Sequence, residues 1–158
     1  MQMAHINETQ RYTIYRMRKD RKTQQEIARA IGVPHIPDRV SIRQRPPEVE
    51  AREEFGHFEM DLTQNGKDFI LTLTERKSRF LLMERLPDGK TAAAVAAVVI
   101  RLLRPFKKSL RSITTDNGGE FAKHKLIAKK LGVPVFFTDP YSSWQKGTVE
   151  NTNKLIRQ

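Results

Sequence analysis

The sequence has no cysteine among its 158 residues, which excludes disulfides, thiolate metal sites and cysteine nucleophiles. It also has no apolar run near the roughly 18 residues of a transmembrane helix, and its N-terminus lacks the apolar stretch of a signal peptide. We therefore expect a soluble, cytoplasmic protein without membrane association. Any bound metal must use oxygen or imidazole ligands.

Basic residues outnumber acidic ones, with 29 Lys and Arg against 18 Asp and Glu, a net charge of +11. Such an excess favours a polyanionic partner, and nucleic acid leads over a membrane surface because long apolar segments are missing. Residues 1–54 carry 11 basic and 8 acidic residues, whereas residues 55–158 carry 18 and 10. The second segment is therefore the better candidate for facing phosphates. The length suits one core with a short appendage.

Residues 1–33 have the pattern of two short helices. Thr23 is a helix cap, and Glu26 three residues later completes a capping box. Ile27 begins the apolar face of this second helix, which ends at Gly32. The segment is typical of the first half of a helix-turn-helix, although a generic amphipathic helix pair fits equally well. Prolines at 34, 37, 46 and 47 then predict a linker over residues 34–54.

Residues from 55 onward change to strand patterns. Phe58, Met60 and Leu62 alternate with polar residues, the period of a half-buried strand with its acids on one face. Asn65-Gly66 predicts a hairpin turn, and further strands are expected over 69–74 and 79–86.

Later segments alternate between helices and strands. A helix is expected over 92–103, followed by a strand over 113–115, a helix ending at Leu131, a strand over 135–138 and a helix from Thr148. This order predicts an α/β fold in which helices flank a mixed five-stranded sheet.

Position and composition alone single out none of the chain's 18 acidic residues, and Asp61, Asp116 and Glu150 are distinguished by the sequence blocks that contain them. Asp61 lies on the first strand, Asp116 ends the fourth and Glu150 lies early in the last helix. Neighbouring strands would bring the two aspartates to one edge of the sheet, which the last helix can cross. Carboxylates from three elements suit Mg²⁺ or Mn²⁺, and two ions about 3.5–4 Å apart can support an in-line phosphoryl displacement.

Four sequence blocks carry a family resemblance: FEMD at 58–61, TERKSRF at 74–80, TDNGGEF at 115–121 and DPYSSWQKGTVENTN at 139–153. From about residue 36 to 158 the chain resembles bacterial insertion-sequence transposases with an Asp-Asp-Glu site, the family named after insertion sequence thirty. The resemblance implies an integrase catalytic core with a ribonuclease H-like fold over 55–158. It also implies that Asp61, Asp116 and Glu150 are catalytic and bind the metal, Mg²⁺ or Mn²⁺.

The activity implied by the resemblance is cleavage of phosphodiester bonds at transposon ends, followed by attack of the freed 3′ hydroxyl on target DNA. The implied partners are double-stranded DNA and further copies of the chain, which makes a homo-oligomer on DNA. No small-molecule substrate is implied. The implied location is the bacterial cytoplasm, in association with the nucleoid.

Residues around Glu150 are candidates for contacting DNA. Lys154 and Arg157 share its helical face, where they would lie beside the backbone, unless Lys154 only pairs with Glu150. Lys146, in the loop before this helix, is also expected to contact DNA. Tyr141 and Trp144 in the same loop are expected to stack on unpaired bases, or Trp144 only anchors the loop.

Two other features near the acids have structural interpretations. The segment Asn117-Gly118-Gly119 is expected to use positive φ values in a sharp turn that presents Asp116, or to be an ordinary strand-to-helix turn. Glu59 is on the face of Asp61 but is expected to form a structural hydrogen bond or ion pair rather than to bind metal.

Two departures from the family pattern complete the prediction. Residues 1–33 match only part of a helix-turn-helix, without the recognition helix, and the catalytic domain is expected to be incomplete after Gln158. An internally deleted and C-terminally truncated copy is therefore expected. The first hypothesis for such a copy is an enzyme with an intact triad and weakened DNA specificity. The alternatives are a non-catalytic remnant that binds DNA or interferes with the full-length enzyme, and an unrelated nuclease or other ribonuclease H-like enzyme, which would not explain the block at 139–153.

Overall fold

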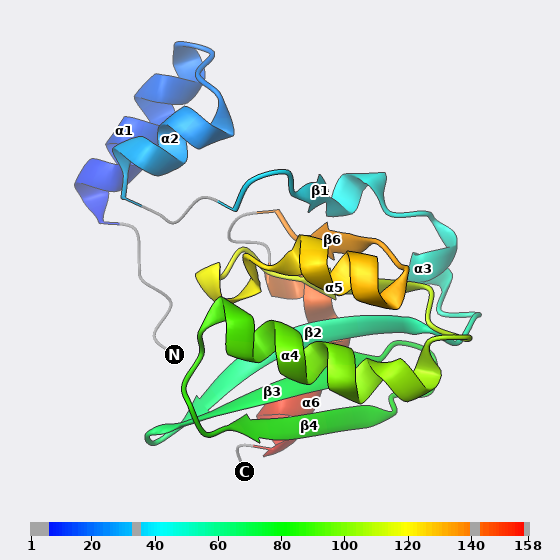
Figure 1. Ribbon diagram of the computed structural model, residues 1–158. Coiled ribbons are helices and arrows are strands. Elements are labelled where there is room, and N and C mark those ends of the chain that lie inside the picture. The colour runs from blue at the N-terminus through cyan, green and yellow to red at the C-terminus, as the bar shows by residue number, and fades with distance from the viewer. Residues whose placement is uncertain (1–6, 33–35, 140–142, 157–158) are drawn as a thin grey trace. The chain divides into compact units, whose positions relative to one another are not determined.

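The structure is a computed structural model that describes residues 7–32, 36–139 and 143–156 (Figure 1). The chain forms two compact units, Met1–Pro37 and Asp38–Gln158. Within the described ranges, no helix combines the length and apolar character needed to cross a bilayer.

The first unit contains two helices, α1 (Glu8–Lys19) and α2 (Gln24–Ala30). Thr23 caps α2 and exchanges hydrogen bonds with Glu26, so the predicted capping box is confirmed. A second capping box, formed by Asn7 and Gln10, starts α1. The side chain of Gln10 also donates to the backbone oxygen of Ile31 at 2.9 Å, which links the two helices.

The second unit is built on a mixed sheet (Figure 1) whose strand order is β1-β6-β5-β2-β3-β4. β2, β3 and β4 are antiparallel neighbours, whereas β5 and β6 continue the sheet parallel to β2, and β1 pairs parallel with β6. The strands are β1 (Val40–Ser41), β2 (His57–Asn65), β3 (Asp68–Glu75), β4 (Leu81–Leu86), β5 (Ser112–Thr115) and β6 (Val135–Phe137). The predicted mixed α/β sheet is confirmed, with β1 as a sixth strand.

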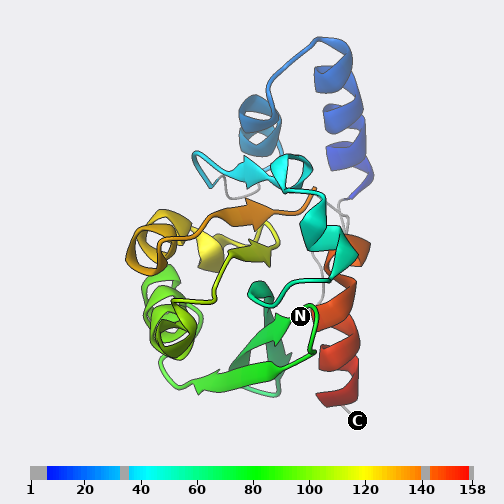
Figure 2. The ribbon, with the colours of Figure 1, turned by 90° about the vertical axis from the view of Figure 1, so that its right-hand side faces the viewer.

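Helices cover both faces of this sheet, as the side view in Figure 2 shows. α4 (Ala92–Leu103) and α5 (His124–Leu131) lie on one face, and α6 (Gly147–Ile156) crosses β2 and β3 on the other. The alternation along β2 serves both layers: Phe58 and Met60 are fully buried in the apolar core, and Glu59 faces α6 through a hydrogen bond to Val149. The sheet is therefore buried on both sides around β2.

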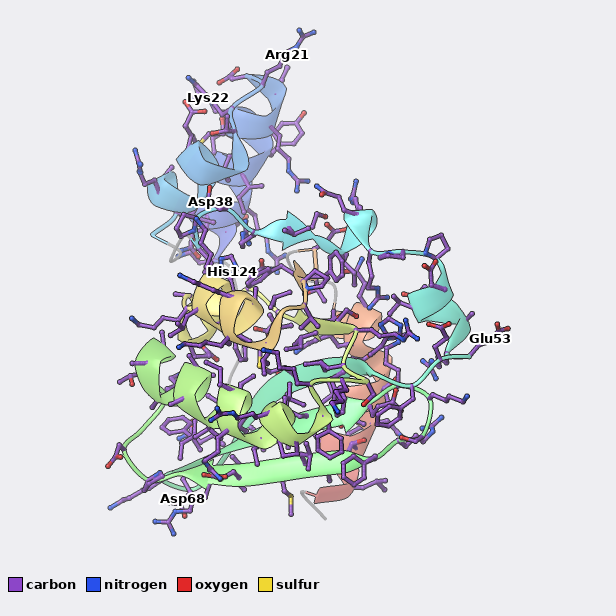
Figure 3. The ribbon with its side chains drawn as sticks, turned by 45° about the vertical axis from the view of Figure 1, so that its right-hand side comes forward. Arg21, Lys22, Asp38, Glu53, Asp68 and His124 are labelled. Atoms are coloured by element: carbon purple, nitrogen blue, oxygen red, sulfur yellow. The ribbon has the colours of Figure 1, made fainter. Side chains whose placement is uncertain are left out.

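Residues 38–54, predicted as linker, contribute structure to the second unit. They form β1, the 3-10 turn η1 (Ile42–Gln44) and the short helix α3 (Glu48–Ala51). Asp38 lies beside the start of α5 and forms an ion pair with Lys125 (Figure 3). The prolines at 46 and 47 precede α3 and do not interrupt it, which is compatible with their lack of an N–H donor.

Several boundaries differ from the predicted ones. β4 begins at Leu81 rather than Arg79, because Arg79 has a φ of 61° and ends the turn after β3. The segment after Asp116 starts with the 3-10 turn η3 (Gly119–Phe121) before α5. α4 has the predicted limits: Thr91 caps it, and Pro105 lies in the turn η2 (Arg104–Phe106) that follows.

Candidate active site

Asp61 and Asp116 lie at the same level of two adjacent parallel strands. The register pairs Glu59 of β2 with Thr114 of β5, and each aspartate follows two residues later. The last 3-10 turn, η4 (Ser143–Lys146), leads directly into α6 on this face of the sheet. The predicted meeting of the two aspartates at one edge of the sheet is thus observed.

Both aspartates contact one cationic atom, the Nζ of Lys146. This ammonium donates to Oδ1 of Asp61 at 3.0 Å and to Oδ2 of Asp116 at 3.1 Å. A third hydrogen bond goes to the backbone oxygen of Met60 at 3.3 Å. The Lys146 side chain is 2% exposed, whereas those of Asp61 and Asp116 are 18% and 41% exposed. Two carboxylate oxygens therefore converge on a point that a positive charge occupies.

The surroundings of Lys146 favour its charged form. Burial lowers the pKa of Lys146, but the charges of Asp116 and Asp61 and their hydrogen bonds raise it more, so the net shift is upward. Lys146 was predicted to contact DNA from a loop, but in the structure its side chain points into the protein and is bound by Asp61 and Asp116. A buried ammonium that is hydrogen-bonded on the protein's own carboxylates is not presented to a DNA backbone.

Asp61 is oriented by the last helix. Its second oxygen, Oδ2, accepts a hydrogen bond of 2.7 Å from Nδ2 of Asn153, a buried residue of α6. The amide oxygen of Asn153 in turn accepts from Thr72 on β3 at 3.0 Å. The chain Thr72–Asn153–Asp61 joins β3, α6 and β2 and fixes the rotamer of the carboxylate. Sequence reasoning missed Asn153, because an asparagine in a polar helix carries no distinctive signal.

Asp116 is oriented by its own loop. Oδ1 accepts the backbone N–H of Gly118 at 2.9 Å, a side-chain turn typical of aspartate. The predicted positive φ is wrong for Gly118, whose φ is −62°. A Cβ at Gly118 would lie 2.6 Å from the carboxyl carbon of Glu120, which is the movable end of a flexible side chain. Asn117 donates to the backbone oxygen of Thr138, the residue directly after β6, at 2.7 Å, and its side-chain oxygen accepts from Arg39.

Glu59 joins β2 to α6 beneath the site. Its carboxylate is fully buried, pairs with Arg76 and accepts the N–H of Val149 at 2.8 Å. Arg76 also donates to the backbone oxygen of Val49 at 3.0 Å. The predicted structural role of Glu59 in an ion pair or hydrogen bond is confirmed.

The remaining predicted residues divide by their position. Glu150 lies in the first half of α6, directly after Val149, and its side chain lies outside the described structure, as does that of Trp144 in η4. Lys154 is exposed on α6. Tyr141 and Arg157 lie outside the described residues.

The donor groups at this edge fit a hard divalent cation. One carboxylate oxygen of Asp61 and one of Asp116 contact the same positively charged nitrogen. Carboxylate oxygens are also the ligands that Mg²⁺ and Mn²⁺ prefer. Among the described side chains, no group of three or more His, Cys, Asp or Glu residues could by itself hold a metal. The two aspartates therefore form the described part of a candidate metal site.

Comparison with solved structures defines the class of fold. The catalytic core domain of BIV integrase is similar to this chain, with a TM-score of 0.53 and 26% sequence identity over 62% of this chain and 64% of that chain. The mixed sheet with an aspartate on its central strand and a second at the end of the neighbouring strand is thus a ribonuclease H-like fold. Residues 51–143 match the family described as Integrase core domain. The chain belongs to this family.

Curated relatives confirm the family resemblance seen in the sequence. The transposase for insertion sequence element IS4351 of Bacteroides fragilis is 42% identical over 146 residues, 91% of this chain and 44% of the relative. Transposase InsI for insertion sequence element IS30A of Escherichia coli (strain K12) is 38% identical over 128 residues, 80% of this chain and 33% of the relative. The chain thus spans less than half of the length of these relatives.

Proposed function

We propose that this protein is a DNA transposase that catalyses metal-dependent cleavage of phosphodiester bonds at insertion-sequence ends and transfer of the freed strand to target DNA. The observation that carries the proposal is the convergence of Asp61 and Asp116 on one cationic atom at 3.0 and 3.1 Å. The similarity to insertion-sequence transposases supports the same reaction.

The proposed metal ligands are Asp61, Asp116 and Glu150, which would hold Mg²⁺ or Mn²⁺, with two ions as the expected number. Bound there, the metal would supply charge neutralisation at the scissile phosphate and activation of the attacking hydroxyl. Glu150 enters this set from its place on α6, four positions after Lys146, and from the sequence block that it shares with the family.

The protein's own groups supply orientation. Asn153 and the N–H of Gly118 each hold one carboxylate oxygen of an aspartate and leave the other oxygen directed toward the shared position. Fixed ligands of this kind lower the entropy cost of placing the reacting groups. Glu59 holds the start of α6 against β2 and thereby sets where Glu150 enters the site.

The proposed partner is double-stranded DNA, at both transposon ends and target sites, bound by a homo-oligomer of the chain. Lys154 and Arg157 would contact its backbone, and Tyr141 and Trp144 its bases, near the scissile phosphate. The helix pair α1–α2 is proposed as part of a helix-turn-helix-like unit. The proposed location is the bacterial cytoplasm at the nucleoid.

A cleavage and strand-transfer assay tests this function. The substrate is duplex DNA carrying the insertion-sequence ends that flank the coding sequence, incubated with Mg²⁺ or with a chelator. We expect cleaved and joined strands with the parent chain and with Asp88→Asn, a control that removes the same charge from an exposed turn between β4 and α4. Asp116→Asn should lose at least about 100-fold in rate. Equal activity of Asp116→Asn and the parent, or activity that persists with the chelator, would contradict the proposal. If neither the parent chain nor Asp116→Asn gives any product, the result would favour a protein that only binds DNA.

A further inference from the structure

The burial of Lys146 is unusual for a lysine and calls for a function beyond packing. Lysine is among the residues least often buried, because desolvation of an ammonium is costly unless its charge and its donors are satisfied. Here all three N–H donors have an acceptor: Met60, Asp61 and Asp116. The pocket is therefore constructed to hold a cation, and in this structure the cation is the ammonium.

The carboxylate oxygens that Lys146 contacts are the two that no other described group orients. Of the four carboxylate oxygens of the two aspartates, Oδ2 of Asp61 accepts from Asn153 and Oδ1 of Asp116 accepts from Gly118. The other two, Oδ1 of Asp61 and Oδ2 of Asp116, both face Nζ of Lys146. A divalent ion that bridges the two aspartates through these oxygens would have to share their lone pairs with a second positive charge.

We propose that Lys146 is a built-in counter-ion that occupies the cation position between Asp61 and Asp116 and is displaced when a divalent metal binds. This inference rests on the proposed function, because it takes the two aspartates as metal ligands. Without the ammonium, two carboxylates facing one point would repel each other, so Lys146 keeps the metal-free site assembled. When the ammonium is in place, a metal ion must compete with Lys146 for the carboxylates of Asp61 and Asp116.

Displacement of Lys146 also connects metal binding to the helix that carries Glu150. Lys146 is the last residue of η4 and Gly147 is the first of α6, so the buried lysine side chain extends into the protein from the junction of the two elements. Its withdrawal changes the packing at this junction, four positions before Glu150. Metal loading and the position of the third acid are thereby coupled.

Direct measurement of Mn²⁺ binding to the full chain tests the displacement. Titration calorimetry compares the parent with Lys146→Met, which keeps an unbranched apolar stem without the charge, and with the exposed control Lys129→Met. We expect Lys146→Met to bind Mn²⁺ about tenfold more tightly, since a like charge next to the ion is removed, and Lys129→Met to bind as the parent does. Unchanged or weaker binding by folded Lys146→Met would overturn the proposal.

Two further measurements keep the outcomes distinct. In thermal unfolding, Lys146→Met should have a lower Tm than the parent without metal and a larger rise in Tm with saturating Mn²⁺. Should Lys146→Met not fold, Lys146→Gln, which is neutral but can still donate to one carboxylate, should show the same tighter binding.

Asp116→Asn should bind Mn²⁺ at least about tenfold more weakly. If Asp116→Asn binds as the parent does, the metal site itself is wrongly placed. If it binds weakly but neither Lys146 variant binds more tightly, only the displacement is refuted.

Discussion

The carboxylate of Glu59 accepts the backbone N–H of Val149 at 2.8 Å, so the strand that carries Asp61 and the helix that carries Glu150 are joined inside the core. Glu59 also neutralises Arg76, whose side chain is 3% exposed. One buried acid thus serves the packing of α6 and the charge balance beneath the site.

Removal of the Glu59 carboxylate should strongly destabilise the second unit. Glu59→Ala removes the buried one of the two carboxylates that pair with Arg76 and leaves only the exposed Glu50, which should cost about 3 kcal/mol in the free energy of unfolding. The control is Glu84→Ala, which breaks the partly exposed pair between Glu84 and Arg101 and should cost less than about 1 kcal/mol. Urea unfolding followed by circular dichroism measures both. Similar losses for the two variants would argue against a special role of Glu59.

Gly56 should not tolerate a side chain. Its φ is +116°, and a Cβ there would lie 2.0 Å from the backbone oxygen of Ser109. We expect Gly56→Ala to lose more than about 4 kcal/mol or to prevent folding. Gly89→Ala is the matched control, since Gly89 also has a positive φ, +82°, but its Cβ would meet nothing within 4 Å. That variant should lose about 1–2 kcal/mol, from backbone strain alone. Equal loss in both variants would contradict the steric explanation.

The sequence predicted the elements that local chemistry determines. α4 was predicted with its observed limits because Thr91 caps it and an apolar run ends before Pro105. The meeting of Asp61 and Asp116 at one edge of the sheet was predicted from the positions of the two strands, on the assumption that these strands are neighbours. β1 was missed, because two residues between prolines become a strand only by pairing with β6, nearly 100 positions away. The buried position of Lys146 was missed because a lysine beside glycine has the pattern of a solvated loop.

Asn153 should matter for chemistry more than for folding. Asn153→Leu keeps the branched shape of the side chain but replaces its polar ends with methyl groups, so Asp61 loses a hydrogen bond and the carboxylate loses its fixed orientation. Loss of such an outer hydrogen bond should lower metal affinity or cleavage rate about 10–100-fold. Asn151→Leu, on the exposed side of the same helix, is the control and should retain both. The test is to measure the cleavage rate and the Mn²⁺ affinity of both folded variants. If Asn153→Leu keeps the parent's rate and affinity, Asp61 does not need the hydrogen bond from Asn153.

Stability should decrease as the pH falls below about 6.5, in part through His57. Burial and the charge of Arg111 lower the pKa of His57 from its ordinary value of 6.5. The unfolded chain therefore binds the proton first, and stability present above pH 6.5 is lost as the pH falls toward the folded-state pKa. Replacement by asparagine, which can keep a hydrogen bond to Ser112, should flatten this slope. Free energies of unfolding at pH 7.5, 6.5 and 5.5 provide the measurement, and identical slopes in parent and His57→Asn would refute the assignment.

The most direct test of the account is a crystal structure of the chain soaked in Mn²⁺, with anomalous diffraction to locate the ion. We predict an anomalous peak within the coordination distance of hard cations, about 2.0–2.6 Å, of Oδ1 of Asp61 and Oδ2 of Asp116, with the Nζ of Lys146 moved away from both oxygens. A crystal at saturating Mn²⁺ in which Lys146 still bridges the two aspartates, with no peak between them, would contradict both the metal site and the function proposed from it.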